Sequence, residues 1–393
     1  MLILKGNYIV KLAFGGEDVA IDTQNIKEFT IVSDMNKMLP EFRIQLHDAG
    51  GILTHLVPFD KGMSTITIQI SDSLKNTLYT AYNFTVYRRQ PEGIFGASSV
   101  YDIRGLLEIN GLFAPSHSRG FTGTVTSTLT QVAEEMGVDE TDISPSLNYV
   151  KTIIQPNWSN MTFLNYLSRN LSGKSSEGGY NIFIRVRDGK SSFVCRTHQE
   201  LAKNPIRINM AVNDNPVEDH FPVMDYFIMD NYKLFGVFGA KKQYYSYFDY
   251  NNSEFKEEEL DATDFFSLSD YFLIDGDDTE VSGVLENGTN NEFTTDFVGR
   301  MKASYYRRLN SLSKIWVLTW GQPNICQGDI AKLLFMQGKA SGNLQAFQYS
   351  GYWMIERVVQ SFTDTFRTRL LLTRCGVDTD KGCTLVSATK KRR

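Results

Sequence analysis

Five histidines are the side chains in this 393-residue chain best suited to acid–base or metal chemistry near neutral pH: His47, His55, His117, His198 and His220. A zinc site of the H-E-x-x-H type places two of them four residues apart on one helix face. No pair of these histidines has that spacing. We therefore interpret them as ordinary surface or core residues rather than as metal ligands.

Two other chemistries can be tested by spacing. Gly173-Lys174-Ser175 resembles the end of a phosphate-binding loop, but the first glycine of that motif falls on Ser168, so the loop cannot form its phosphate cradle. The sequence contains no G-x-S-x-G element that would position a nucleophilic serine. Paired carboxylates for glycan cleavage stay open, because any two acids can meet in space and nothing selects a pair. We predict a non-enzymatic protein without a cofactor or metal.

An acidic stretch runs from residue 254 to residue 280 with a single lysine, Lys256. It has two interpretations: a solvated loop that keeps an assembly soluble, or a docking surface for a basic partner. Asp275-Gly276-Asp277 suggests calcium, but its glycine is at the second position and an EF-hand loop requires it at the sixth. The candidate docking residues are Glu257, Glu258, Glu259, Asp275, Asp277 and Asp278.

An aromatic run precedes the acids. Tyrosine and phenylalanine contribute large contact areas at interfaces and in cores. The run is therefore either a subunit interface or a fully buried barrel strand. The candidate interface residues are Tyr244, Tyr245, Tyr247 and Phe248.

Composition limits the class of protein. Apolar residues make up 42% of the chain and charged residues 22%, which is typical of globular domains, and the length predicts two to four of them. A formal net charge of −5 argues against binding nucleic acid by phosphate neutralisation, and a protein partner is favoured. The four cysteines lack C-x-x-C spacing, and no apolar run approaches a membrane span, so we expect no membrane anchor and assembly in the cytosol.

The first 105 residues have the spacing of successive strands. Strands are predicted over 7–14, 26–32, 41–47, 64–71, 81–88 and 98–106, with turn residues at 15–16, 48–51 and 91–93. The clean alternation over 65–70 is typical of a barrel or sandwich strand.

Helical spacing begins after residue 106. Thr124 is the predicted N-cap of a helix with an apolar stripe from Val125 to Met136, and Ser159 caps a second helix. Asp188-Gly189 between two alternating runs predicts a tight hairpin. A third helix is predicted from about residue 295 to residue 312.

Three sequence motifs follow one another near the C-terminus in an order that is hard to obtain by chance. Gly321-Gln322-Pro323-Asn324 leads to Gln327-Gly328-Asp329 and then to the strand-like run 350–362. This order, together with the helix starts at 123–129 and 153–164, resembles the bacteriophage baseplate hub family, which includes late control protein D and the hub module of VgrG-type spikes. Gln360-Ser361 stands where many members of that family have a histidine.

The resemblance implies an α+β, mainly β fold with two tail-tube-like antiparallel β-barrels and an intervening α/β domain. The predicted domains are 1–105, the first barrel; 106–205 with 251–312, the α/β domain; 206–250 with 313–375, the second barrel; and 376–393, a flexible tail.

The resemblance further implies a homotrimeric ring in the tail baseplate of a virion or tail-like particle. Such a ring adapts a six-fold tail tube, or a distal tail protein, to a three-fold central spike or fibre, contacts other baseplate proteins and passes phage DNA without specific binding. Two rivals stay open, a tail-associated cell-wall hydrolase and a carbohydrate-binding host-recognition module. The sequence does not decide between a contractile and a non-contractile tail.

Overall fold

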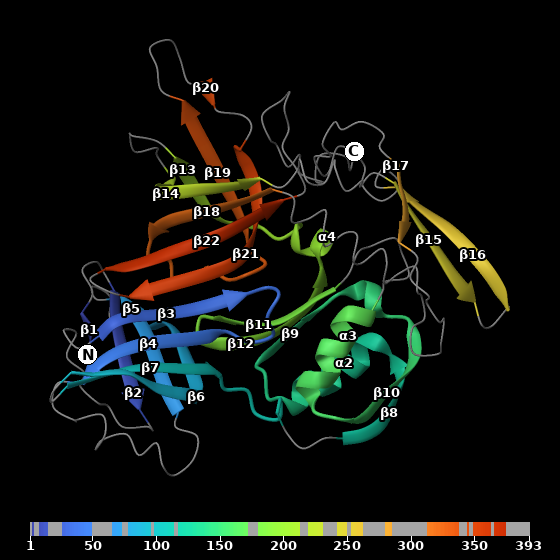
Figure 1. Ribbon diagram of the computed structural model, residues 1–393, viewed down its shortest axis with the longest axis horizontal. Helices are drawn as coiled ribbons and strands as arrows, with labels where there is room; N and C mark the ends of the chain where they lie inside the picture. Colours follow the sequence, from blue (N-terminus) through green and yellow to red (C-terminus); the bar gives the residue numbers. More distant parts are fainter. Residues whose placement is uncertain are drawn as a thin grey trace.

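The structure is a computed structural model that describes part of the chain. The described residues are 2–3, 8–14, 26–48, 65–72, 78–95, 98–113, 117–171, 180–212, 219–230, 242–249, 253–261, 280–284, 313–337, 344–345, 349–362 and 365–374. Their strands form one extended sheet of fourteen strands and three smaller sheets (Figure 1). The mainly β character of the prediction is confirmed.

The N-terminal half of the extended sheet is antiparallel, with strand order β1-β2-β5-β6-β7-β4-β3. Its buried side chains alternate with partly exposed ones along β4, as expected for a strand with one face on a core. The described pairings make an open run, so closure into a first barrel stays a prediction. The strands are β1 (Leu2–Ile3), β2 (Tyr8–Phe14), β3 (Ile26–Asp34), β4 (Glu41–Asp48), β5 (Thr65–Asp72), β6 (Leu78–Phe95) and β7 (Ser98–Leu107).

One predicted turn is wrong. Pro91-Glu92-Gly93 lies inside the 18-residue strand β6, where the register to β7 shifts between Pro91 and Gly93. Proline has no N–H to donate, and a bulge leaves one residue without a partner, so the strand tolerates it at that point.

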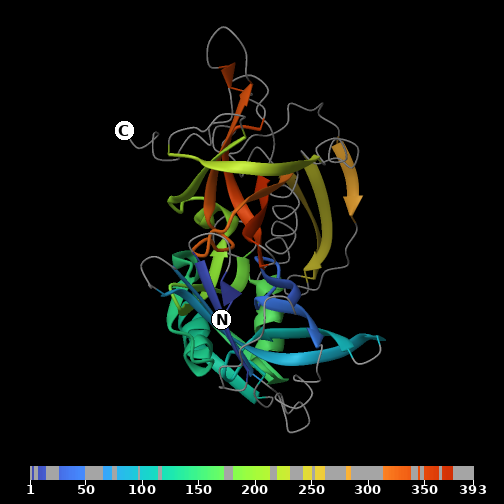
Figure 2. The ribbon, with the colours of Figure 1, turned by 90° about the vertical axis from the view of Figure 1, so that its left-hand side faces the viewer.

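The C-terminal half of the extended sheet closes on itself. Six strands pair in the order β21-β22-β18-β14-β13-β19, and β19 pairs back onto β21. Figure 2 shows this barrel stacked above the N-terminal sheet. The strands are β13 (Ile206–Val212), β14 (Phe221–Asp230), β18 (Ser313–Trp320), β19 (Ile330–Gln337), β21 (Gly351–Phe362) and β22 (Phe366–Arg374), and the short β20 (Leu344–Gln345) pairs with the end of β19.

The barrel differs from the predicted one in two respects. It is not wholly antiparallel, because β13 pairs in parallel with both β14 and β19. It is also continuous with the N-terminal sheet, because β21 pairs with β19 over 351–354 and with β3 over 357–361. Strand β21 extends beyond the end of its pairing with β19, and β3 pairs with this extension. The pairing with β3 therefore removes an open strand edge, which would favour aggregation.

A compact α/β unit lies between these halves in the chain. Helices α2 (Val125–Glu135) and α3 (Asn160–Asn170) pack between the β8–β10 pair and the three-stranded sheet β11-β12-β9. The remaining elements are β8 (His117–Thr124), β9 (Glu140–Ile143), the 3-10 turn η2 (Pro145–Leu147), β10 (Val150–Trp158), β11 (Tyr180–Arg187), β12 (Lys190–Thr197) and α4 (His198–Leu201).

Local sequence signals in this unit are confirmed. The Ser159 hydroxyl accepts a hydrogen bond from the Thr162 N–H at the start of α3. Asp188 and Gly189 have φ of 51° and 78°, the two positive values that a type I′ hairpin turn requires between β11 and β12.

The cap of α2 gives a testable effect on stability. Thr124 Oγ1 accepts a hydrogen bond of 3.0 Å from the Ser127 N–H, which otherwise has no partner in the first turn. Thr124→Ala should lower the free energy of unfolding by about 1 kcal/mol. Thr126→Ala is the matched control, because the Thr126 hydroxyl is buried without a hydrogen-bond partner and its removal should cost little or nothing. Urea denaturation of both variants checks this, and equal losses would contradict the cap.

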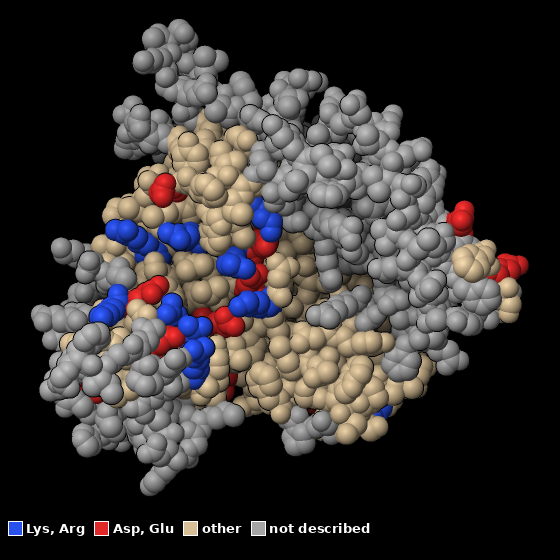
Figure 3. All heavy atoms as spheres, in the orientation of Figure 1, with Lys and Arg blue, Asp and Glu red and all other residues tan. Residues whose placement is uncertain are grey.

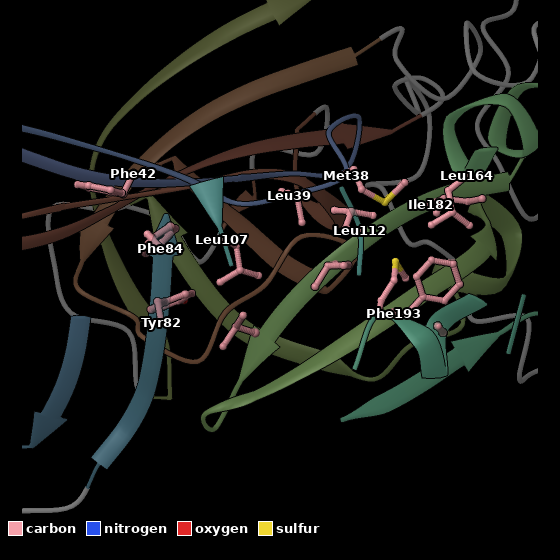
Figure 4. Close-up of a cluster of buried hydrophobic side chains, with 14 of the residues drawn as sticks. Met38, Leu39, Phe42, Tyr82, Phe84, Leu107, Leu112, Leu164, Ile182 and Phe193 are labelled. Atoms are coloured by element: carbon pink, nitrogen blue, oxygen red, sulfur yellow. The ribbon is translucent and has the colours of Figure 1, made fainter. Parts of the chain in front are cut away.

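The α/β unit and the N-terminal sheet share one hydrophobic core. Figure 4 follows it from Phe42 and Phe84 through Leu107 and Leu112 to Leu164 and Phe193. The barrel has its own core around Trp353. A third, smaller cluster joins all three parts: Met35, Phe183, Val194, Leu201, Ile330 and Met354.

A separate three-stranded sheet lies to one side of the barrel in both views (Figures 1 and 2). It consists of β15 (Lys242–Asp249), β16 (Glu254–Asp261) and β17 (Glu280–Val284), with β15 in the middle. The sequence places 206–250 in the second barrel, whereas the pairings described for β15 are with β16 and β17. The domain boundaries stay predictions, and the predicted helix at 295–312 lies outside the described residues.

Candidate functional site

The described residues hold no arrangement typical of a metal or nucleophilic site. Within them, no group of three or more His, Cys, Asp or Glu side chains could hold a metal ion. Burial raises the pKa of the Cys326 thiol to about 11, and burial also raises the pKa of the Cys195 thiol, so both are protonated and unreactive near neutral pH. Gly173-Lys174-Ser175 and His55 lie outside the described residues. The helices of the described part include none long and apolar enough to cross a membrane.

The turn at residues 326–329 instead fastens the barrel to the α/β unit. Both carboxylate oxygens of Asp329 accept hydrogen bonds of 2.6 Å from the Arg187 guanidinium at the end of β11. The same carboxylate accepts from the Cys326 N–H at 3.0 Å. Gln327 donates to the carbonyl of Ile184, and Cys326 donates to the carbonyl of Val186. The Gln-Gly-Asp step that the family resemblance marked is therefore a joint between two parts of the chain.

Backbone geometry makes this joint possible. Gly328 has φ of +81°, which side chains other than glycine rarely adopt. Its N–H donates to the carbonyl of Ile355 on β21, and its carbonyl accepts from Asn204 just after α4. The turn thus contacts the barrel and the α/β unit with its main chain as well as its side chains.

A second joint ties the β3–β4 loop to β21. Asp34 accepts a hydrogen bond of 2.7 Å from Arg357, and the side-chain amide of Asn36 donates to Glu356 at 3.1 Å. The Met35 N–H donates to the carbonyl of Glu356. These contacts hold β3 beside β21, where the N-terminal sheet continues into the barrel.

That continuation produces a row of arginines across one face of the sheet. Residues that pair directly between neighbouring strands project from the same face. Through six successive pairings the row crosses β6, β7, β4, β3, β21, β22 and β18. In that order its residues are Arg88, Arg104, Arg43, Thr30, Ser361, Arg367 and Trp320. None is buried, and Arg88, Arg367 and Trp320 are exposed.

Aromatic side chains adjoin the arginines at the barrel end. Arg369, also exposed, lies two residues along β22 from Arg367 and pairs with Leu318. Trp320 is 47% exposed, and Phe227 on the next strand, β14, is 65% exposed. We call this surface the arginine face, defined by Arg43, Arg88, Arg104, Arg367 and Arg369 with Trp320 and Phe227. Figure 3 shows lysines and arginines gathered there.

Asp102 organises one end of the arginine face. Its side chain is buried, and it accepts hydrogen bonds from Arg43 at 2.7 Å and from Arg104 at 2.9 Å. Burial raises the pKa of Asp102, but the two guanidinium groups outweigh burial and hold the pKa below its usual value. The contact holds both arginines in place on the sheet.

Because of Asp102, the free energy of unfolding should decrease at acidic pH. Because its pKa is lowered on folding, its stabilisation is complete above the unfolded carboxyl pKa of about 3.9 and is lost as the pH falls through the folded value. Asp102→Asn should be less stable at pH 7 and should lose less further stability between pH 5 and pH 3 than the wild type. Asp188→Asn, an exposed turn residue, is the control. Urea unfolding across this range checks the slope, and identical slopes for Asp102→Asn and wild type would contradict it.

The two candidate sets from the sequence lie opposite each other in one hairpin. Tyr244 pairs with Glu259 and Tyr245 with Glu258 in the backbone register of β15 and β16. Tyr247 pairs with Lys256, Phe248 with Phe255, and Ser246 with Glu257. Glu257 is exposed, and Phe255 is 69% exposed. Their roles as interface and docking residues stay predictions.

The interpretation of the acidic stretch as a loop is wrong over its first part, because Glu254–Asp261 forms the strand β16. Glutamate disfavours strands by itself, but the β-favouring aromatics of β15 pair with it along its whole length. Asp275, Asp277 and Asp278 lie outside the described residues.

Sequence reasoning missed the arginine face. Its polar half is visible in β4, where Glu41, Arg43 and Gln45 alternate with buried apolar residues. That signal does not predict the row, because the residues that pair between β3 and β21 are more than 320 positions apart in the chain.

The fold is thus a closed six-strand barrel that is continuous with a second sheet and fastened to a two-helix α/β unit. No family model matches the sequence, and no curated protein matches it. Solved structures do match its fold.

Two of the matching structures are of tail proteins. The tail protein from Neisseria meningitidis MC58 is 9% identical, with a TM-score of 0.57 over 94% of this chain and 97% of its own. The 43 kDa tail protein of prophage MuSo2 from Shewanella oneidensis is 10% identical, with a TM-score of 0.59 over 94% and 100%. The Escherichia coli c3393 protein, a type VI secretion component with structural similarity to the T4 tail proteins gp27 and gp5, is 11% identical, with a TM-score of 0.52 over 95% and 78%. At these identities the likeness establishes a shared fold.

Proposed function

We propose that this chain is a structural baseplate hub of a phage tail or tail-like particle. The observation that supports it most is the extent of the fold match, which covers nearly all of this chain and nearly all of two tail proteins, one of them from a prophage. In this role the chain forms a homotrimeric ring that adapts a six-fold tail tube, or a distal tail protein, to a three-fold spike or fibre. The ring sits in the virion baseplate, assembles in the host cytoplasm and contacts other baseplate proteins.

The arrangement of the sheets suits such a ring. Two sheets per chain joined through β3 and β21 give three chains six similar lobes, which matches six-fold symmetry on one side and three-fold symmetry on the other. The two joints at Asp329 and Asp34 hold the barrel at a fixed position relative to the rest of the chain. A hub that transmits load needs that rigidity.

In this proposal the hub also forms part of the DNA conduit. A channel that passes DNA without binding it must not attract phosphate, and the chain as a whole has a net charge of −5. The arginine face would bind phosphate if it lined the channel. We therefore assign the arginine face to a surface that is covered by protein.

The hub acts without catalysis. Two assays test it against the two rivals: a zymogram on cell-wall substrate, and binding to host surface glycans by the purified chain. We expect no clearing and no glycan binding. A cleared band would support a tail-associated hydrolase, and saturable glycan binding would support a carbohydrate-binding host-recognition module.

A pull-down with the tail-tube protein tests the positive claim. The purified hub should retain the tube protein of the same particle, and the complex should contain three hub chains. Retention of no tube, distal tail or spike protein under any salt condition would contradict the proposal.

A further inference from the structure

The arginine face has an excess of positive charge. Apart from the ion pairs named next, strand pairing places three acids on the same side of the sheet as its five arginines: Glu28, Asp102 and Asp225. The other charges beside it are matched ion pairs: Lys37–Glu41, Arg357–Asp34 and Lys314–Glu356. The described side chains of this face therefore include more arginines than acids, although the chain as a whole has a net charge of −5.

The hairpin of β15 and β16 has the opposite character. Its two strands contain six acids and two lysines, together with five aromatic residues. We call it the acidic hairpin, defined as 242–261. Its described side chains Glu254, Phe255 and Glu257 are exposed.

The two surfaces lie on different sides of one chain. In Figure 3 the cationic side chains gather over β18, β22, β21, β3 and β4, whereas the acidic side chains of β16 project at the far edge, beyond the position of β15 in Figure 1. None of the strand pairings described for the hairpin joins it to the barrel or to the N-terminal sheet. Because the two surfaces face different sides, one copy of the chain can offer each of them to a different neighbouring copy.

We propose that the acidic hairpin of one copy docks on the arginine face of the next copy. Such a contact joins two different surfaces of identical chains, and a head-to-tail contact of this kind closes into a ring when the rotation allows. The inference rests on the proposed hub function and names the surfaces that would hold the ring together.

The two surfaces complement each other both in charge and in their aromatic residues. Glutamates of the hairpin would meet guanidinium groups, which form the strongest hydrogen-bonded ion pairs with carboxylates. Tyrosine and phenylalanine of the hairpin would cover Trp320 and Phe227, which are exposed on the single chain. Guanidinium groups also bind phosphate, so nucleic acid is the alternative occupant. The net charge of −5 of the chain disfavours it, and it is an outcome of the test below.

The test uses charge reversal on the full chain. Arg367→Glu with Arg369→Glu reverses the face, and Glu257→Lys with Glu258→Lys and Glu259→Lys reverses the hairpin. Lys203→Glu with Arg207→Glu is the matched control, since these exposed cations lie outside both surfaces and give the same change in net charge as the face variant. Sedimentation velocity measures association, and circular dichroism checks that each variant is folded.

Each single-surface variant should associate on the order of 100-fold more weakly than the wild type, because like charges then face each other across the contact. The control should associate as the wild type does. The chain with both surfaces reversed should regain the three-membered ring.

Mixing provides a sharper test. A face-reversed chain and a hairpin-reversed chain match each other in both directions, so their mixture should form alternating pairs. A closed ring of three cannot alternate, so the mixture should give even-numbered species and no trimer. An isologous contact, in which each surface binds the same surface of another copy, does not restrict the mixture to even-numbered species.

The outcomes separate this inference from the hub proposal. Wild-type rings that are insensitive to both reversals would overturn the docking inference and leave the hub proposal standing. A wild type that stays monomeric at high concentration and low salt would overturn both. Salt-dependent DNA binding that is lost with Arg367→Glu and Arg369→Glu, without an effect on association, would assign the face to nucleic acid and overturn the inference.

Discussion

Replacing Asp329 by alanine should lower the free energy of unfolding by about 3–5 kcal/mol, because it leaves a largely buried guanidinium without its partner. Asp329 is 2% exposed, and its carboxylate is the acceptor for both Arg187 and the Cys326 N–H. The loss combines an uncompensated charge with an unpaired main-chain donor. Chemical denaturation at pH 7 measures it.

A double-mutant cycle separates the ion pair from the rest of the turn. Asp329→Asn keeps an acceptor for the Cys326 N–H, and Arg187→Met keeps much of the apolar stem. Combining the two should cost clearly less than the sum of the single variants, because no buried charge then lacks a partner. Additive losses would show that Arg187 and Asp329 do not interact, and would contradict the joint.

Trp353→Ala should destabilise the chain by about 3–5 kcal/mol, the usual loss for a large aromatic removed from a packed core. Trp353 is fully buried at the centre of the barrel core. Its indole N–H donates to the Tyr349 carbonyl at 3.1 Å, and the Arg374 guanidinium lies 3.8 Å from the centre of its ring. The variant therefore removes apolar contacts, a hydrogen bond and a cation–π contact together.

Trp320 is the matched control on the same barrel. Because it is 47% exposed, Trp320→Ala should change the free energy of unfolding by at most about 1 kcal/mol. If the arginine face is a contact between copies, the same variant should weaken association. Thermal and urea unfolding compare the two tryptophans, and equal losses of stability would contradict the assigned barrel interior.

The local parts of the fold were predictable from the sequence. Helices α2 and α3 begin where Thr124 and Ser159 place an N-cap, and the β11–β12 turn follows from Asp188-Gly189. Each of these signals lies within a few residues of the structure it determines. Six of the seven described N-terminal strands were likewise predicted to within a few residues at most ends, apart from the extension of β6 through Pro91; the short β1 was not predicted.

The long-range parts were not predictable in the same way. The pairing of β3 with β21, the parallel placement of β13 between β14 and β19, and the separate sheet of β15 depend on contacts between distant segments. Alternation in β4 shows that Arg43 leaves the core, but it contains no information about which strands lie beside it. The arginine face therefore emerges only once seven strands are in register.

The most direct test of the central claim is electron imaging of the purified chain, classified without imposed symmetry. The proposal predicts three-fold rings with six inner lobes around an open centre, and binding of tail-tube protein to one side of the ring. Rings of another order, or single chains that neither close on themselves nor bind tube, distal tail or spike protein, would contradict it.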